Sequence, residues 1–205
     1  MRKGEKTRER LMDIAESSVL AKGFSATSID EIIAEAEITK SGFFYHFKDK
    51  NELAQALLER YVERENVLLD DLFKKAADLH DDPLHIFLIG LKLFADLMAD
   101  MPKGHPGCLV ATYCYHERLY DAKVIELNRQ AVLNWRNRFS KAFQDICDRY
   151  PPRDDVSVEA LADMVSNTVE GAIVMSKALK EPKVMVDQIL LLRSYIKLLF
   201  QPVPG

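Results

Sequence analysis

The chain has 205 residues, of which 48% are hydrophobic, and its 28 Lys and Arg residues against 32 Asp and Glu residues give a net charge of −4. That length is enough to bury the core of one large domain or two small ones. No apolar run approaches the roughly 20 residues that span a bilayer, and the charged N-terminal segment does not resemble a secretory signal, so we expect a soluble, cytoplasmic protein.

The first part of the chain begins with a helical pattern that a glycine ends. Apolar residues recur at helical spacing from Leu11 to Val19, and Gly23 follows as a C-terminal stop signal. The hydroxyl of Thr27 can accept a hydrogen bond from a backbone N–H of the next helix, so Thr27 is its predicted N-cap. The apolar stripe of that second, shorter helix comprises Ile29, Ile32, Ile33 and Ala36.

A third helix is predicted after a turn at Glu37. Thr39 can cap this helix, and an aromatic block ends it at Phe47. Phe43, Phe44 and Phe47 are predicted to belong to the core of the resulting three-helix head. Two short helices joined by a tight turn are typical of the helix-turn-helix, whose second helix enters the major groove of DNA.

The head is neutral although the whole chain is acidic. Residues 1–50 contain nine basic and nine acidic residues, so the acidic excess lies in residues 51–205. Five of the nine basic residues fall within the first ten positions, namely Arg2, Lys3, Lys6, Arg8 and Arg10. Such a local positive arm can meet phosphates, and we expect DNA binding to be sensitive to salt.

The rest of the chain also follows helical periodicity, and no convincing strand pattern interrupts it. The fold class is therefore all-α, with a helix-turn-helix domain at residues 1–50 and a larger helical body at residues 51–205. The first helix of the body is long and is expected to connect it to the head. The predicted helices of this part lie at about 49–77, 83–100, 108–120 and 124–146.

The last two predicted helices, 157–179 and 182–200, differ from the others in composition. The final helix is apolar on more than one face, which a helix with one buried side does not need. The helix before it carries small residues, namely Ala160, Ala162, Ser166, Gly171, Ala172 and Ser176. Small residues let helices approach closely, so we expect a homodimer in which two chains form a four-helix interface.

The order of residues over positions 8–58 resembles that of the TetR family of bacterial transcriptional regulators. The resemblance implies an all-helical dimer of about nine helices, with an operator-binding head and a ligand-binding body. Glu37 stands where a glycine is common in the family, and Phe44 stands where a tyrosine commonly contacts phosphate. The matching features are Thr27, the Ile- and Ala-rich helix, the turn 36–38, Thr39-Lys40-Ser41, the aromatic block, Lys50 and Leu53.

The predicted DNA contacts fall into two groups. Thr39, Lys40 and Ser41 lie at the N-terminal end of the third helix, the end that helix-turn-helix proteins present to base edges. A second group is predicted to contact phosphates and to set the register, namely Thr27, Tyr45, His46 and Lys50. A dimer presents two such helices, so the expected partner is a palindromic operator in double-stranded DNA. Repression would follow from occlusion of a promoter.

The body is predicted to bind a small-molecule effector that releases the protein from DNA. A partly apolar ligand needs aromatic and apolar side chains with a few polar groups among them. A helical bundle also needs such residues as its core, so packing is the alternative role for each of them. The candidates are Phe87, Leu91, Phe94, Met98, Tyr113, His116, Trp135 and Phe139.

The three cysteines, Cys108, Cys114 and Cys147, form no C-x-x-C pair, so we expect reduced thiols, no metal site and no cofactor. Cys108 begins a predicted helix, whose dipole favours a thiolate, and one alternative is a regulator that senses oxidants or electrophiles through this residue. A second alternative is an enzyme in which His105 or His116 activates Cys108, and a third is an activator of transcription. Because an enzyme leaves the helix-turn-helix pattern unexplained, a non-enzymatic regulator is the favoured hypothesis.

Overall fold

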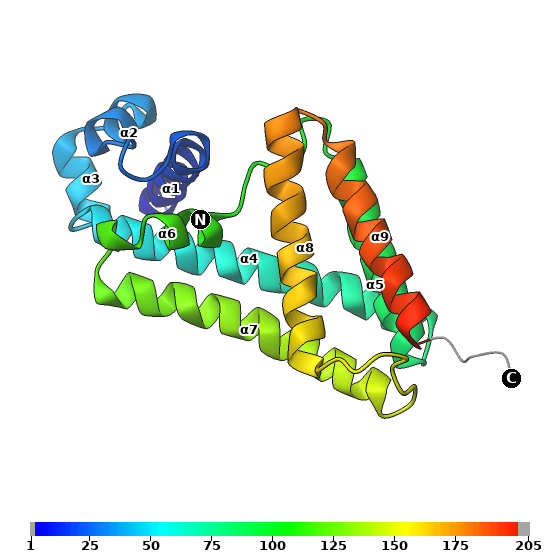
Figure 1. Cartoon of the computed structure of the whole chain (residues 1–205). Helices are drawn as coiled ribbons and strands as arrows, with labels where there is room; N and C mark the ends of the chain where they lie inside the picture. The colour runs from blue at the N-terminus through cyan, green and yellow to red at the C-terminus, as the bar shows by residue number, and fades with distance from the viewer. Residues whose placement is uncertain (1–2, 201–205) are drawn as a thin grey trace, which may run out of the picture. The chain divides into compact units, whose positions relative to one another are not determined.

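The computed structural model describes residues 3–200, with side chains from residue 4 onward, so Arg2 of the predicted basic arm lies outside the described residues. Every regular element in this range is helical, which confirms the all-α prediction (Figure 1). None of these helices is long and apolar enough to cross a membrane. The elements are α1 (Lys3–Lys22), α2 (Ile29–Ala36), α3 (Lys40–His46), α4 (Lys50–Leu79), α5 (Pro83–Ala99), α6 (Leu109–Tyr115), a 3-10 turn η1 (Glu117–Leu119), α7 (Ala122–Cys147), α8 (Val158–Leu179) and α9 (Lys183–Phe200).

The chain divides into two compact units that differ from the predicted domains. The first unit comprises residues 1–65 and 108–132, and the second comprises residues 66–107 and 133–205. α6 therefore packs with the head, although the sequence assigns it to the body. Both α4 and α7 continue from one unit into the other without a break in the helix.

The helix caps agree with the sequence patterns except at α2. Thr39 caps α3 as predicted, since its hydroxyl accepts the N–H of Gly42 at 3.1 Å. At α2, however, the N-cap is Ser28, whose hydroxyl accepts the N–H of Glu31 while the Glu31 carboxylate accepts the N–H of Ser28, both at 3.1 Å. This reciprocal pair is a capping box. The prediction of Thr27 as the cap is wrong because Thr27 is buried and donates its hydroxyl hydrogen to the carbonyl of Gly23.

In the turn of the helix-turn-helix, a residue other than glycine adopts the left-handed conformation. Glu37, the C-cap of α2, has φ 56° and ψ 41°. A residue with a Cβ atom is strained there by about 1–2 kcal/mol. Arg10 of α1 lies beside this turn, where its guanidinium donates to the carbonyl of Glu35 at 3.2 Å and stands 3.8 Å from the Glu37 carboxylate.

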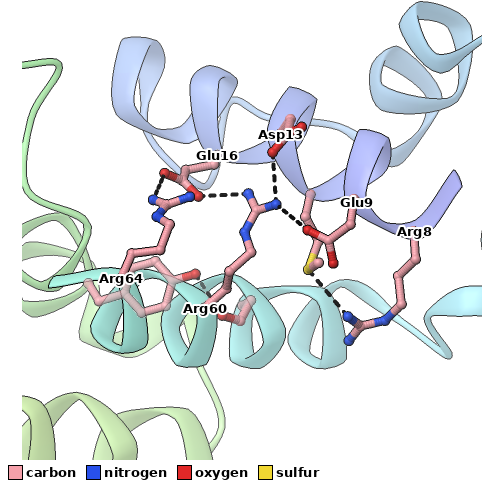
Figure 2. Close-up of polar contacts among 9 residues, drawn as sticks. Arg8, Glu9, Asp13, Glu16, Arg60 and Arg64 are labelled. Carbon is pink, nitrogen blue, oxygen red and sulfur yellow. Dashed lines mark hydrogen bonds and ion pairs between the residues drawn. The ribbon is translucent and has the colours of Figure 1, made fainter. Parts of the chain in front are cut away.

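A cluster of charges fastens α1 to α4 in the first unit. Figure 2 shows the guanidinium of Arg60, on α4, directed at three carboxylates of α1. It donates to Glu9 at 2.9 Å and to Asp13 and Glu16 at 2.8 Å each. The Arg60 and Glu16 side chains are only 16% and 12% exposed, and Arg64 bonds the second oxygen of Glu16. The Arg60–Glu16 contact, which is shielded from water on both sides, is stronger than an ordinary surface pair, whereas Glu9 and Asp13 are 44% and 70% exposed.

Three aromatic rings join α6 to the loop after α1. Tyr113 of α6 stacks on Tyr120 with 4.3 Å between ring centroids, and Phe24 lies 4.6 Å from Tyr120. The Tyr113 hydroxyl also donates to the carbonyl of Ala54 in α4 at 2.9 Å. The predicted helix over 108–120 is shorter in the structure, because the chain leaves helical geometry at His116 and continues as the 3-10 turn η1.

The core of the second unit is an aromatic cluster. The Phe87 ring lies 4.7 Å from Phe143, 5.6 Å from Phe73 and 6.3 Å from Phe139, measured between centroids. Phe73 rests directly on Gly90, where an added Cβ atom would come within 2.8 Å of the ring. In the same unit α9 packs along both α5 and α8 (Figure 1).

The turn between α4 and α5 is tied to the segment after α7 through Asp82. The Tyr150 hydroxyl donates to this carboxylate at 2.6 Å, and Arg149 lies 3.3 Å from it. Asp82 also caps α5 by accepting the N–H of His85 at 3.1 Å. Burial opposes ionisation of Asp82, but the bonds from Tyr150 and His85 outweigh it and hold the pKa of Asp82 well below its usual range.

We predict that Arg60→Met lowers the free energy of unfolding by about 2–3 kcal/mol, because it leaves the buried Glu16 carboxylate with less compensation. Urea denaturation followed by circular dichroism measures the change. The matched control is Arg129→Met in the same unit, whose pair with Glu126 is exposed and whose loss should barely move the midpoint. Equal shifts for the two variants would contradict a special role for Arg60.

We also predict that Glu37→Gly raises the free energy of unfolding by about 0.5–1 kcal/mol, because relief of left-handed strain exceeds the extra backbone entropy of glycine. Glu37→Ala is the control, since it removes the carboxylate but keeps the Cβ atom and the strain. The prediction fails if the glycine variant is no more stable than the alanine variant in thermal and urea denaturation.

Candidate nucleic-acid interface

The exposed face of α3 carries the residues predicted to contact bases. Thr39, Lys40 and Ser41 are all exposed at its N-terminal end. The Thr39 and Ser41 hydroxyl oxygens are 3.4 Å apart, and Thr39 is also engaged as the cap. Hydroxyls that both donate and accept, together with an ammonium group, can recognise base edges of the major groove.

Lys40 places an exposed positive charge at the N-terminal end of α3. Its ammonium lies 3.5 Å from the carboxylate of Asp30, and the lysine and aspartate side chains are 69% and 81% exposed. An ion pair this exposed is weak, so Lys40 can exchange it for a base or a phosphate at little energetic cost.

Two predicted phosphate contacts lie near the C-terminal end of α3. The Tyr45 side chain is 82% exposed, and its ring meets that of His46 edge to face at 5.0 Å. His46 is half-buried, and burial together with the nearby Arg8 charge lowers the pKa of His46 below its ordinary value. His46 is therefore neutral near pH 7, and it can offer a phosphate a ring N–H but no full charge.

The other two predicted phosphate contacts are engaged inside the head. Thr27 is 1% exposed, and its hydroxyl lies 3.0 Å from that of Ser18 in addition to its bond to Gly23. The Lys50 ammonium donates to the carbonyl of Phe24 at 2.5 Å and lies 4.2 Å from the centre of the Phe24 ring. Burial lowers the pKa of Lys50. Neither side chain is presented outward like those of Lys40 and Tyr45.

The three phenylalanines of α3 and its C-cap do not share one environment. Phe43 and Phe47 are buried, with 0% and 1% of their surface exposed, as predicted for core residues. Phe44 is 45% exposed, so the prediction that it belongs to the core is wrong. The difference follows from the helix repeat, which places Phe44 one residue beyond the buried stripe, on the same side as Lys40 and Ser41.

The sequence contains the pattern of one helix cap that we did not predict. Ser28 and Glu31 have the S-x-x-E spacing of a capping box, which identifies the start of α2 more specifically than Thr27 does. The role of Arg10 at the turn had no such local signal, because its partners are 25 and 27 residues away in the chain.

The eight predicted effector contacts do not fall within one compact unit. Tyr113 and His116 belong to the first unit with the head. The six in the second unit are Phe87, Leu91, Phe94, Met98, Trp135 and Phe139. Of these, Phe94 and Trp135 are half-buried and the rest are buried. The hydroxyl of Ser140, next to Phe139 in α7, is buried and has no hydrogen-bond partner within the described residues.

Cys108 has a structural role as the N-cap of α6. Its sulfur accepts the N–H of Ala111 at 3.4 Å, and the residue is 9% exposed. Cys114 is exposed and its sulfur receives a hydrogen bond from Asn128, while burial raises the pKa of Cys147. No group of three or more His, Cys, Asp or Glu residues within the described range is arranged to hold a metal ion. Thiol sensing through Cys108 stays a prediction.

The similarity of this chain to known proteins agrees with the helix-turn-helix geometry of the head. Residues 11–57 fit the model of the family described as bacterial regulatory proteins, tetR family. An uncharacterized HTH-type transcriptional regulator of Bacillus subtilis (strain 168), YvkB, is 32% identical over 80 residues, which are 39% of this chain. The chain spans only 41% of the length of YvkB, and between 35% and 38% of two further relatives.

Other similarities cover nearly the whole chain. The HTH-type transcriptional repressor DhaR of Mycobacterium sp. (strain GP1) is 23% identical over 171 residues, covering 83% of this chain and 82% of DhaR. The crystal structure of a TetR transcriptional regulator from Chloroflexus aurantiacus J-10-FL superposes with a TM-score of 0.77 at 25% identity, over 96% of this chain and 97% of that one. Residues 11–57 therefore have the sequence of the TetR family of bacterial transcriptional regulators, and the described helices have the fold of a TetR transcriptional regulator.

Proposed function

We propose that the protein is a repressor that binds a palindromic DNA operator as a homodimer and is released by a small molecule. The observation that carries this proposal is the N-terminal end of α3, where Thr39, Lys40 and Ser41 are exposed together on the second helix of a helix-turn-helix. That end is the part of such helices that meets base edges. Tyr45 stands beside them as the most exposed aromatic side chain of α3 and is assigned to the phosphate backbone.

Dimerisation through α8 and α9 is supported by exposed apolar stripes on both helices. Each stripe follows the three- and four-residue steps that define one helix face. The large members are 41–60% exposed, and they are Val174, Met175 and Leu179 on α8 and Leu191, Tyr195 and Leu198 on α9. On α8 the stripe continues to Gly171, where an added Cβ atom would meet nothing within 4 Å. An apolar surface of this kind, with room for a neighbouring helix, suits an isologous four-helix interface.

The effector is assigned to the second unit, where half-buried Phe94 and Trp135 lie on α5 and α7, the helices that carry Phe87 and Phe139 of the aromatic core. The unpartnered Ser140 hydroxyl supplies a polar group in the same unit for a mostly apolar ligand. For release to be nearly complete, the ligand must favour the non-binding conformation by about 5.5 kcal/mol, which corresponds to a shift from 1:99 to 99:1.

Selection of bound fragments from random duplex DNA tests the proposal directly. We expect a palindromic sequence to be enriched, and we expect Lys40→Ala to weaken binding to it by about fivefold to 150-fold, because a base contact contributes about 1–3 kcal/mol. Lys92→Ala is the matched control, since Lys92 is also an exposed lysine paired with an aspartate but lies in the second unit. Absence of an enriched sequence, or equal effects of the two variants in fluorescence anisotropy, would overturn the proposal.

Light scattering of the purified protein tests the dimer. We expect the wild type to have twice the mass of one chain, and Leu191→Glu to have the mass of a single chain, because it places a charge in an apolar interface. Leu79→Glu is the control, since Leu79 is comparably exposed at the end of α4 but lies outside the stripes. A monomeric wild type, or a Leu191→Glu variant that remains dimeric, would count against this interface.

A further inference from the structure

We infer that Phe44 determines sequence specificity by contacting the 5-methyl group of a thymine in the operator, an inference that rests on the proposed DNA-binding function. Phe44 is a large apolar residue with 45% of its surface exposed on the helix proposed to enter the major groove. The thymine methyl is an apolar feature that this groove displays, and phenylalanine is one of the side chains that can recognise it.

The position of Phe44 on α3 places its ring among the proposed base contacts. Lys40 and Ser41 precede it by four and three residues, which makes them its neighbours on the helix surface. All three side chains are exposed. Helical side chains are also tilted toward the N-terminus, so the Phe44 ring covers the turn that contains Lys40 and Ser41. The ring therefore lies toward the end of the helix that faces base edges.

The Phe44 ring also packs against its buried neighbour in the absence of DNA. Phe44 meets the buried Phe43 edge to face, with 5.4 Å between centroids and planes at 89°. A side chain that is already ordered loses less conformational entropy when it binds. Since phenylalanine has no hydroxyl, Phe44 cannot donate a hydrogen bond to a phosphate, and apolar contact is the interaction that its side chain offers.

Thymine-to-uracil substitution in the selected operator tests the inference, because it removes the methyl group and leaves every hydrogen-bonding group of the base unchanged. For the full-length wild type we expect uracil at one thymine position to weaken binding by about threefold to fivefold per half-site, the size expected for one buried methyl group. Phe44→Ala should bind the thymine operator more weakly than wild type and should bind the thymine and uracil operators equally.

Two further variants separate this contact from a general loss of binding. Phe44→Leu keeps an apolar side chain and should retain part of the preference for thymine, which also guards against misfolding of the alanine variant. Tyr45→Ala removes the neighbouring exposed aromatic residue. It should weaken binding to both operators by the same factor and leave the preference for thymine intact.

The possible results distinguish this inference from the proposed function. If an operator is bound but no thymine position shows a wild-type preference that Phe44→Ala abolishes, the methyl contact is wrong and the DNA-binding function stands. If Phe44→Ala weakens binding to both the thymine and the uracil operator while the preference for thymine persists, Phe44 contacts the DNA backbone instead. If no duplex is enriched at all, both the proposed function and this inference fail.

Discussion

The charge cluster around Arg60, with the shielded Glu16 carboxylate in it, is the interaction on which the arrangement of the head depends. α2 has eight residues and α3 has seven, and helices this short are not stable in water without tertiary contacts. α3 packs with α2, α2 packs with α1, and α1 is in turn bound to α4 by the bonds from Arg60 to Glu9, Asp13 and Glu16 (Figure 2). The placement of α3 in the head therefore depends, through α2 and α1, on the ionic contacts between α1 and α4.

The aromatic contacts of α6 add a second constraint of a different kind. Tyr113 bonds the Ala54 carbonyl of α4, and its ring, with that of Tyr120, packs against Phe24 in the loop after α1. A three-helix head would otherwise have a small core, and these rings enlarge the apolar surface that it buries. A segment that follows the head by more than forty residues is therefore part of the same packing unit.

Local patterns in the sequence predicted the features that depend on nearby residues. Helical periodicity and cap residues located most helices, and they placed Lys40 and Ser41 on an exposed helix end because that position depends only on the repeat and on the cap at Thr39. The roles of Lys50 and Arg10 depend on carbonyl groups 25 or more residues away, so no local pattern contained them. The packing of α6 with the head was not predictable from local sequence either. Periodicity shows which face of a helix is apolar but not which unit that helix packs against.

The connections between the two units bear on how an effector would act on the head. The chain passes from one unit to the other at 65/66 inside α4, at 132/133 inside α7, and at 107/108 just before α6. A bend of the chain at the first two crossings would disrupt backbone hydrogen bonds within α4 or α7. The third crossing instead follows a non-helical segment with glycines of positive φ at 104 and 107. In the proposed mechanism, rearrangement of this segment is therefore the less costly route. Because Tyr113 of α6 contacts both α4 and the loop before α2, a shift of α6 would reach the helices that position α3.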